Sequence, residues 1–237
     1  GPSPRKARQR LWRIRAKKIV LATGSIERPL VYFDNDRPGC MTASAVRTYV
    51  NRYGVTPGRR VVLMTNNDTA YRTALDLANA GVTVPAIVDL RAEVTGPLAK
   101  AAREKGIEIL AGHAITKVHG EQGVKEVEVA RLSDDGKSVT GSTRRISCDC
   151  VGTSGGWQPT VHLHSQTRSK VKWDDALNAF VPGDSIPGQN FVSIGGAHGV
   201  FDLAACLTEG HVAGAAAALE AGNGGNGGSA PTAEAAT

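Results

Sequence analysis

The sequence predicts an α/β fold, a Rossmann-like parallel sheet with an inserted or appended antiparallel β meander. Two observations carry this prediction. Strands of buried type alternate with helical segments from residue 59 to residue 110, and that order implies parallel strands joined by right-handed crossovers. Residues 124–132 and 139–146 alternate in polarity on either side of Asp134-Asp135-Gly136-Lys137, which predicts an antiparallel hairpin.

The N-terminal part supplies two expected strands and a helix. Residues 11–16 alternate between apolar and basic side chains, which favours a half-buried strand. Residues 19–22 form a short apolar run that leads into Thr23-Gly24, where a missing side chain permits a sharp turn. A helix is expected from Thr42 or Ser44, either of which can cap it, to about Tyr53.

Residues 59–89 have the layout of a dinucleotide-binding βαβ unit. A buried strand at 61–64 is followed by a tight loop, a helix from about residue 70 to 80, and a second strand that ends in Asp89. In such units a G-x-G-x-x-G loop receives a pyrophosphate, and an acid about 20 residues further on binds the ribose. Asp89 stands at that place, but the loop Thr65-Asn66-Asn67-Asp68-Thr69-Ala70 contains no glycine.

This loop leaves two interpretations open. Asn66 and Asn67 tolerate left-handed conformations, so the turn itself survives without glycine. Asp68 is an anion at the position of the phosphate, and we expect it to cap the following helix instead. The loop is therefore either a working NAD site or a self-capped helix start, and Asp89 either binds ribose or does not. Arg91 either favours a 2′-phosphate or is merely solvated.

The remaining elements follow in order. Residues 160–190 are polar and expected to be irregular, and His162 and His164 would share one face if extended. The other expected elements are a helix from 97 to about 105, strands at 107–110, 114–118, 148–151 and 191–194, a helix from about 201 to 219, and a disordered tail at 223–237.

Composition narrows the functional class. The 237 residues carry a net charge of +6 and no apolar stretch of membrane-spanning length. The start lacks the apolar core of a signal peptide, so we expect a cytoplasmic protein. Eight basic residues lie between Arg5 and Lys18, but no recognition motif accompanies them, so neither nucleic acid nor membrane is expected as a partner. Cys148 and Cys150 form a C-x-C without a second pair, and no metal site is expected.

Several segments together resemble one family. KKIVLATGSIERPL, VGTSGGWQPTVHL and NFVSIGGAHGVFDLAACLTEGHVAG are similar to turns and strands of two-dinucleotide-domain flavoprotein reductases. RPGCMTASAVRTYVNRYGV and TNNDTAYRTALDLANAGV resemble, more specifically, the α subunit of heterotetrameric sarcosine oxidase. The resemblance covers nearly all of residues 11–222, and the large subunits of octopine oxidase and proline dehydrogenase are similar at a greater distance.

The resemblance implies an oxidoreductase that demethylates sarcosine to glycine with O₂ and releases hydrogen peroxide. It implies NAD in the α subunit, FMN at an interface with the β subunit, and FAD in that partner subunit. No residue of this chain is assigned a catalytic role. Cofactor contacts are expected at three glycine turns and at the glycine-free unit: Thr23, Gly24, Gly155, Gly156, Gly195 and Gly196, and Thr65, Asn66, Asn67, Asp68 and Asp89.

The resemblance also sets the expected domains. Residues 1–16 would form a basic strand or linker, 17–58 and 158–222 parts of a first dinucleotide domain, and 59–157 a pyridine-nucleotide domain with the meander. The chain looks like the middle of an α subunit. Because Gly196 stands where relatives carry an acid that binds flavin, tight FAD binding by this chain is doubtful. Two rival functions remain, a free-standing NAD(P)H-dependent FAD oxidoreductase and a non-catalytic assembly module of an amine oxidase complex.

Overall fold

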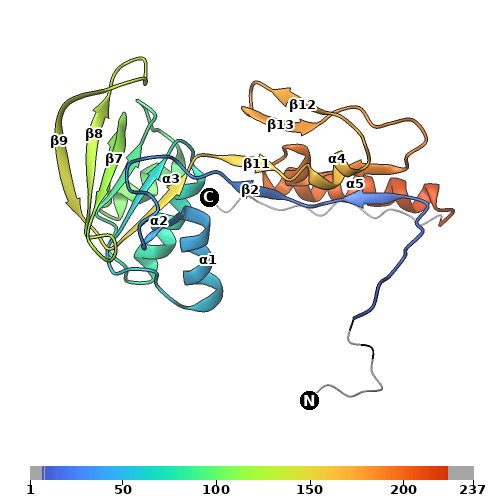
Figure 1. Cartoon of the computed structure of the whole chain (residues 1–237), viewed down its shortest axis with the longest axis horizontal. Helices are drawn as coiled ribbons and strands as arrows, with labels where there is room; N and C mark the ends of the chain where they lie inside the picture. Colours follow the sequence, from blue (N-terminus) through green and yellow to red (C-terminus); the bar gives the residue numbers. More distant parts are fainter. Residues whose placement is uncertain (1–6, 8, 224–237) are drawn as a thin grey trace. The chain divides into compact units, whose positions relative to one another are not determined.

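The computed structural model describes residues 7 and 9–223, which form two compact units (Figure 1). Unit 1 comprises the described residues up to Ser25 and from Pro159 onward, and unit 2 comprises residues 26–158. The chain passes between the units twice, through β2 (Ser25–Glu27) and β11 (Trp157–Pro159), and these two strands pair with each other.

Unit 2 is built on a parallel sheet of five strands, as the sequence predicted. Their order is β3 (Cys40–Thr42), β10 (Cys150–Ser154), β4 (Val61–Thr65), β5 (Ala86–Asp89) and β6 (Glu108–Ala111). The crossovers contain α2 (Thr69–Asn79) and α3 (Pro97–Glu104), while α1 (Ala43–Tyr53) follows β3. Every residue of β4, β5 and β10 is buried, because helices or strands cover both faces of a parallel sheet.

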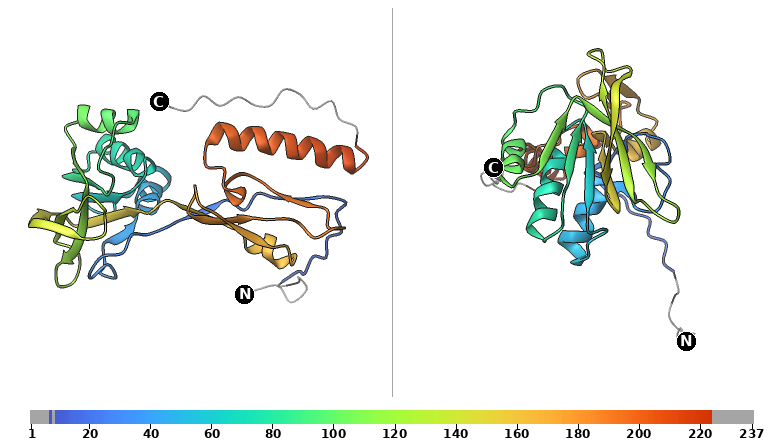
Figure 2. Two further views of the ribbon diagram at one scale, coloured as in Figure 1. Left: turned by 90° about the horizontal axis from the view of Figure 1, so that it is seen from above. Right: turned by 90° about the vertical axis from the view of Figure 1, so that its left-hand side faces the viewer.

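Two hydrophobic clusters hold unit 2 together, one on each face of the sheet. The three helices cover one face (Figure 2), where Leu63, Tyr71 and Leu77 are fully buried. The antiparallel meander of β7 (His113–His119), β8 (Glu126–Leu132) and β9 (Val139–Ser147) covers the other. The predicted meander is thus confirmed, and its position explains why alternating strands follow the parallel ones.

The edge strand β3 joins the sheet through a long-range pairing. Cys40 lies opposite Val151 of β10, far later in the chain. Thr42 takes the N-cap position of α1, as predicted, but its side chain makes no capping hydrogen bond. The buried carboxylate of Glu27 instead accepts the Ser44 N–H at 2.7 Å, so the first turn of α1 is capped from β2.

Unit 1 has two short sheets and one long helix. β1 (Ile19–Leu21) pairs in parallel with β14 (Phe191–Ser193), and β12 (Val171–Asp174) forms a hairpin with β13 (Ala179–Pro182). The short α4 (His162–Gln166) precedes the hairpin, and the 3₁₀ helix η1 (Gly195–His198) precedes α5 (Leu203–Glu220). None of the eighteen residues of α5 is buried.

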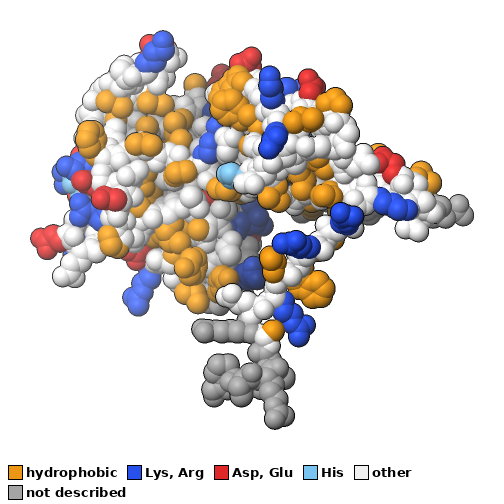
Figure 3. Space-filling view, turned by 45° about the vertical axis from the view of Figure 1, so that its right-hand side comes forward, with side chains coloured by type: hydrophobic (Ala, Val, Ile, Leu, Met, Phe, Trp, Pro, Cys, Tyr) orange, Lys and Arg blue, Asp and Glu red, His pale blue; other side chains and the backbone are white. Residues whose placement is uncertain are grey.

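Two expectations for unit 1 were wrong. Residues 160–190 are not irregular, since they contain α4 and the hairpin, and α4 places His162 and His164 on a helix rather than on one face of a strand. Residues 11–16 form no strand, and Leu11, Trp12 and Ile14 are 88, 74 and 83% exposed. Basic and hydrophobic side chains are interleaved along this segment in Figure 3. Arg5, Lys6 and Arg8 lie outside the described residues, as does the expected tail beyond residue 223.

The compact units also differ from the expected boundary at residue 58. Residues 26–58 lie with unit 2 rather than with the first dinucleotide domain, because β3 completes the sheet of unit 2 and α1 packs against α2. Among the described residues, no helix combines the length and the apolar character that crossing a bilayer requires.

Candidate nucleotide-binding sites

The carboxyl ends of β4 and β10 define the first candidate site. After β4 the sheet continues through β5 and β6, whereas β10 and β3 extend it the other way. Ligands of open α/β sheets bind at such a switch point. Thr65 ends β4, Ser154 ends β10, and the glycine-free loop begins between them. The sequence therefore folds into the expected dinucleotide-binding layout.

Asn67 fills this switch point with its own amide. Its Nδ2 donates to the carbonyl and the hydroxyl of Ser154, both at 3.1 Å. Its Oδ1 accepts the Thr69 N–H at 3.0 Å and the Thr69 hydroxyl. The Thr65 hydroxyl closes the turn by accepting the Asn67 N–H at 3.1 Å. The loop is thus fastened to β10, and the first helical donor of α2 is satisfied by Asn67.

The predicted role of Asp68 as a side-chain cap was wrong. Asp68 occupies the N-cap position of α2, but its carboxylate makes no capping hydrogen bond. It turns away to Arg91, whose Nη2 lies 2.8 Å from Asp68 Oδ1. The reason is competition, because Asn67 already accepts the helical N–H and the guanidinium offers a charge-assisted partner.

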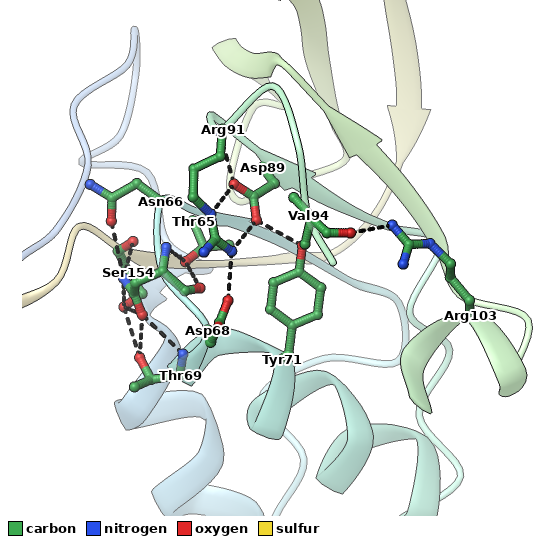
Figure 4. A network of polar contacts seen from close by, with 11 residues as sticks. Thr65, Asn66, Asp68, Thr69, Tyr71, Asp89, Arg91, Val94, Arg103 and Ser154 are labelled. Atoms are coloured by element: carbon green, nitrogen blue, oxygen red, sulfur yellow. Dashed lines mark hydrogen bonds and ion pairs between the residues drawn. The ribbon is translucent and has the colours of Figure 1, made fainter. Parts of the chain in front are cut away.

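Asp89 lies at the centre of this network (Figure 4) and is fully buried. Its Oδ1 accepts from the Arg91 N–H at 2.9 Å and from Arg91 Nε at 3.0 Å. Its Oδ2 accepts from Arg91 Nη2 at 2.8 Å and from the Tyr71 hydroxyl at 2.7 Å. Arg91 is therefore a partner of Asp89 rather than a solvated side chain. Both carboxylate oxygens already have protein donors.

The network shifts the titration of its members. Burial and the hydrogen bond to Asp89 raise the pKa of the Tyr71 hydroxyl. The hydrogen bonds to Asp89 and Asp68 raise the pKa of Arg91. Tyr71 and Arg91 therefore stay protonated through the neutral range. Arg103 supports the loop that carries Arg91, since its Nη2 donates to the Val94 carbonyl at 2.8 Å.

Gly155 and Gly156 lie where β10 passes β2. The Gly155 N–H donates to the Arg28 carbonyl at 2.6 Å, and a Cβ on Gly155 would lie 3.0 Å from that oxygen. Gly156 has a φ of +92°, which favours glycine. The structure thus gives these two glycines a packing reason. Trp157 follows them, and its Nε1 lies 3.4 Å from the Thr69 hydroxyl.

The two glycine turns of unit 1 form the second candidate site, where they converge. Gly24 and Gly195 have φ values of +72° and +62°. A Cβ on Gly196 would lie 3.1 Å from the Gly24 carbonyl carbon, so the two turns touch through backbone. The Thr23 hydroxyl donates to the Thr160 carbonyl at 2.9 Å and fixes the first turn. Turns bare of side chains are suited to close approach by a nucleotide.

Glu209 and His198 belong to this second site, and no sequence motif indicated Glu209. The Gly195 N–H donates to Glu209 Oε2 at 2.7 Å, and His198 Nδ1 lies 2.6 Å from Glu209 Oε1. Both side chains line a cavity of about 390 Å³ in unit 1. A salt bridge from Lys18 to Glu220 lies at the same cavity. Among the described residues, no three histidine, cysteine or acidic side chains are grouped as metal ligands.

Comparison with known proteins places this geometry in a family. The family model described as pyridine nucleotide-disulphide oxidoreductase matches residues 5–182. The chain belongs to the pyridine nucleotide-disulphide oxidoreductase family. The family and the fold indicate an oxidoreductase with a nucleotide-binding fold, which confirms the fold class and the resemblance stated from the sequence.

Curated relatives agree with that assignment. The chain is 41% identical over 91% of its length to sarcosine oxidase subunit alpha of Corynebacterium sp. (strain P-1), and it covers 22% of that protein. It is 41% identical over 85% of its length to the subunit of the same name from Rhizobium meliloti, and it covers 19% of it. The chain thus spans about a fifth of the length of these relatives.

Solved structures show the same fold at low identity. Thioredoxin reductase of T. acidophilum gives a TM-score of 0.63 at 18% identity, with 86% of this chain and 64% of that chain covered. L-proline dehydrogenase from P. horikoshii gives 0.63 at 19% identity, with 90% and 36% covered. Both structures therefore share the fold of this chain.

Proposed function

We propose that this chain is the nucleotide-binding part of the α subunit of a heterotetrameric sarcosine oxidase complex. The observation that carries the proposal is 41% identity to sarcosine oxidase subunit alpha over 91% of the chain. In this proposal the chain binds NAD and helps to frame an FMN at the interface with the β subunit. The partner β subunit holds FAD and oxidises sarcosine to glycine, with O₂ reduced to hydrogen peroxide.

The converging turns of unit 1 support NAD binding at Thr23-Gly24 and Gly195-Gly196. Gly196 packs against the Gly24 backbone, and Gly24 itself has open space where a Cβ would stand, so a phosphate-bearing group could lie against main chain there. Bound NAD would supply a hydride acceptor. Within the chain, Glu209 fixes the second turn by holding the Gly195 N–H and the His198 ring. Thr23 fixes the first through Thr160.

The test is to identify the small molecule that the native protein releases. The chain is purified with its co-expressed partner subunits and denatured, and the supernatant is examined by absorbance and mass spectrometry. NAD, FMN and FAD are expected from the complex, with the FAD coming from the β subunit. FAD tightly bound to this chain alone would favour the free-standing FAD oxidoreductase. No nucleotide together with retained partner binding would favour the assembly module.

A glycine variant tests the position of the site. Gly196→Val places a side chain against the Gly24 backbone, so NAD retention is expected to fall while unit 2 stays folded. Gly214→Val is the matched control in the same unit, because Gly214, like Gly196, has no positive φ, but a Cβ there meets open space. Equal NAD retention in both variants would contradict a site at these turns. Sarcosine-dependent peroxide from the isolated chain would contradict the assignment of amine oxidation to the partner.

A further inference from the structure

We infer that the dinucleotide-binding layout of unit 2 excludes nucleotides, because its own Asn67, Asp68 and Arg91 occupy the positions of the pyrophosphate and the ribose. The inference takes its ligand from the function proposed above. It assigns NAD to unit 1 alone, with one molecule per chain. Asp68 and Asn67 are then the residues that determine which of the two units binds the nucleotide.

The first step concerns the donors that a pyrophosphate needs. A glycine-rich loop works because phosphate oxygens reach backbone N–H groups at the start of a helix. Here the Thr69 N–H is already bound to Asn67 Oδ1. The side-chain amide of Asn67 also donates to Ser154 at the end of β10. It therefore bridges the ends of β4 and β10. A pyrophosphate would have to displace the Asn67 side chain from both Thr69 and Ser154.

The second step concerns charge. Two carboxylates, Asp68 and Asp89, share the single guanidinium of Arg91. The trio therefore carries a net negative charge at the mouth of the loop, where Asp68 is 53% exposed. Space is limited too, because a Cβ on Gly96 at the start of α3 would lie 3.3 Å from Asp68 Oδ2. A pyrophosphate would meet repulsion where nucleotide sites offer attraction.

The third step concerns the ribose. Binding of ribose hydroxyls needs a carboxylate that faces the ligand. Asp89 is fully buried, and both of its oxygens accept from Arg91 or Tyr71. Arg91 lies across it and is held on the far side by Asp68. Asp89, which the sequence pattern marks as the ribose-binding acid, therefore has both oxygens bound to protein donors and none facing a ligand.

The experiment restores a glycine loop without disturbing the buried pair. In the double variant Asn67→Gly, Asp68→Gly the first helical donor becomes free and Arg91 loses one carboxylate, while Asp89 keeps its partners. ADP is the probe, and its affinity is measured by calorimetry on the full chain in the Gly196→Val background, which removes the proposed unit 1 site. Affinity is expected to rise roughly ten-fold or more over Gly196→Val alone. Unchanged or lower affinity would overturn the inference.

The matched control is Asn66→Gly, which adds a glycine to the same loop but leaves Asn67, Asp68 and Arg91 in place. In the same background it is expected to bind ADP as Gly196→Val alone does, and a gain equal to that of the double variant would overturn the assignment to Asn67 and Asp68. A second experiment needs no variant: amide hydrogen exchange of residues 65–69 is measured in the wild type with and without NAD. Protection of residues 65–69 on addition of NAD would refute exclusion.

The outcomes separate this inference from the proposed function. If the wild type binds no NAD at all, the proposed function fails, yet a gain of ADP binding in the double variant still supports exclusion by unit 2. If the wild type binds two NAD molecules per chain, the proposed function survives and exclusion fails. One NAD per chain, lost in Gly196→Val and retained in Asn66→Gly, supports both.

Discussion

The two units differ in how much hydrophobic core they bury. Unit 2 contains both hydrophobic clusters found among the described residues, and its parallel sheet is covered on each face. Unit 1 has a two-stranded parallel sheet and a helix of which no residue is buried. The same contrast holds at the strand ends, where unit 2 is closed by its own side chains and unit 1 presents bare glycine turns. Stability and candidate ligand contacts are thus separated between the units.

Core truncation should show the largest contrast between the units. Leu77→Ala in α2 removes a fully buried side chain from the helix-side cluster and is expected to lower the free energy of unfolding by about 3–4 kcal/mol. Leu219→Ala in α5 removes a side chain that is 63% exposed, and the expected change is below about 0.5 kcal/mol. Urea unfolding monitors both. Similar losses would mean that α5 is covered in solution.

Removal of Arg91 comes next in size. Arg91→Ala leaves the buried Asp89 carboxylate with only the Tyr71 hydroxyl and one N–H, and a loss of about 3 kcal/mol is expected. The counterpart in unit 1 is Lys18→Ala, which breaks a partly exposed ion pair with Glu220 and should cost less than about 1 kcal/mol. Thermal melts of the two variants measure the difference. An Arg91→Ala protein as stable as wild type would show that Asp89 rearranges freely.

Alkaline pH should weaken unit 2 in particular. Burial raises the pKa of Cys148 and Cys150 from 9.0 to about 12. These thiols ionise in the unfolded chain first, so their stabilisation is complete below pH 9 and is lost as pH rises toward 12, by about 1.4 kcal/mol per pH unit for each thiol. The urea midpoint of the wild type should fall as pH rises from 8 to 11. Replacing both thiols by alanine should reduce this fall more than Cys206→Ala in unit 1 does.

Thiol labelling gives the mildest test of the comparison. Cys206 in unit 1 is partly exposed, whereas Cys148 and Cys150 are buried. A disulfide reagent at pH 8 is expected to modify Cys206 well before either buried thiol, which should react only on unfolding. Peptide mapping of the labelled protein checks the order. Early labelling of Cys148 would indicate that the meander opens readily.

The sequence predicted those parts of the fold that depend on local pattern. Polarity placed β4, α2 and β5 to within a residue or two, and the alternating segments gave the meander. The strand expected at residues 11–16 failed because alternation needs a neighbouring strand to become a ladder, and none of the described residues supplies one. Residues 160–190 were missed because short polar hairpins carry little periodicity.

The candidate sites depended more on tertiary contacts. Position along the chain was enough to find the loop and Asp89. It could not show that Asn67 rather than Asp68 would cap α2, since that choice depends on Ser154 and Arg91 reaching the loop from other strands. Glu209 was missed for the same reason, because its contact with Gly195 exists only once α5 packs beside η1.

The pairing of Cys40 with Val151 has a consequence for synthesis on the ribosome. β3 emerges early, yet its hydrogen-bonding partner β10 follows only about 110 residues later, a delay of roughly 6–20 s at ordinary elongation rates. Until then Met41, Val46 and the buried side of α1 have no sheet to cover them. A nascent chain therefore carries an unpaired strand edge while about 110 further residues are translated, and this interval is when a holding chaperone would matter most.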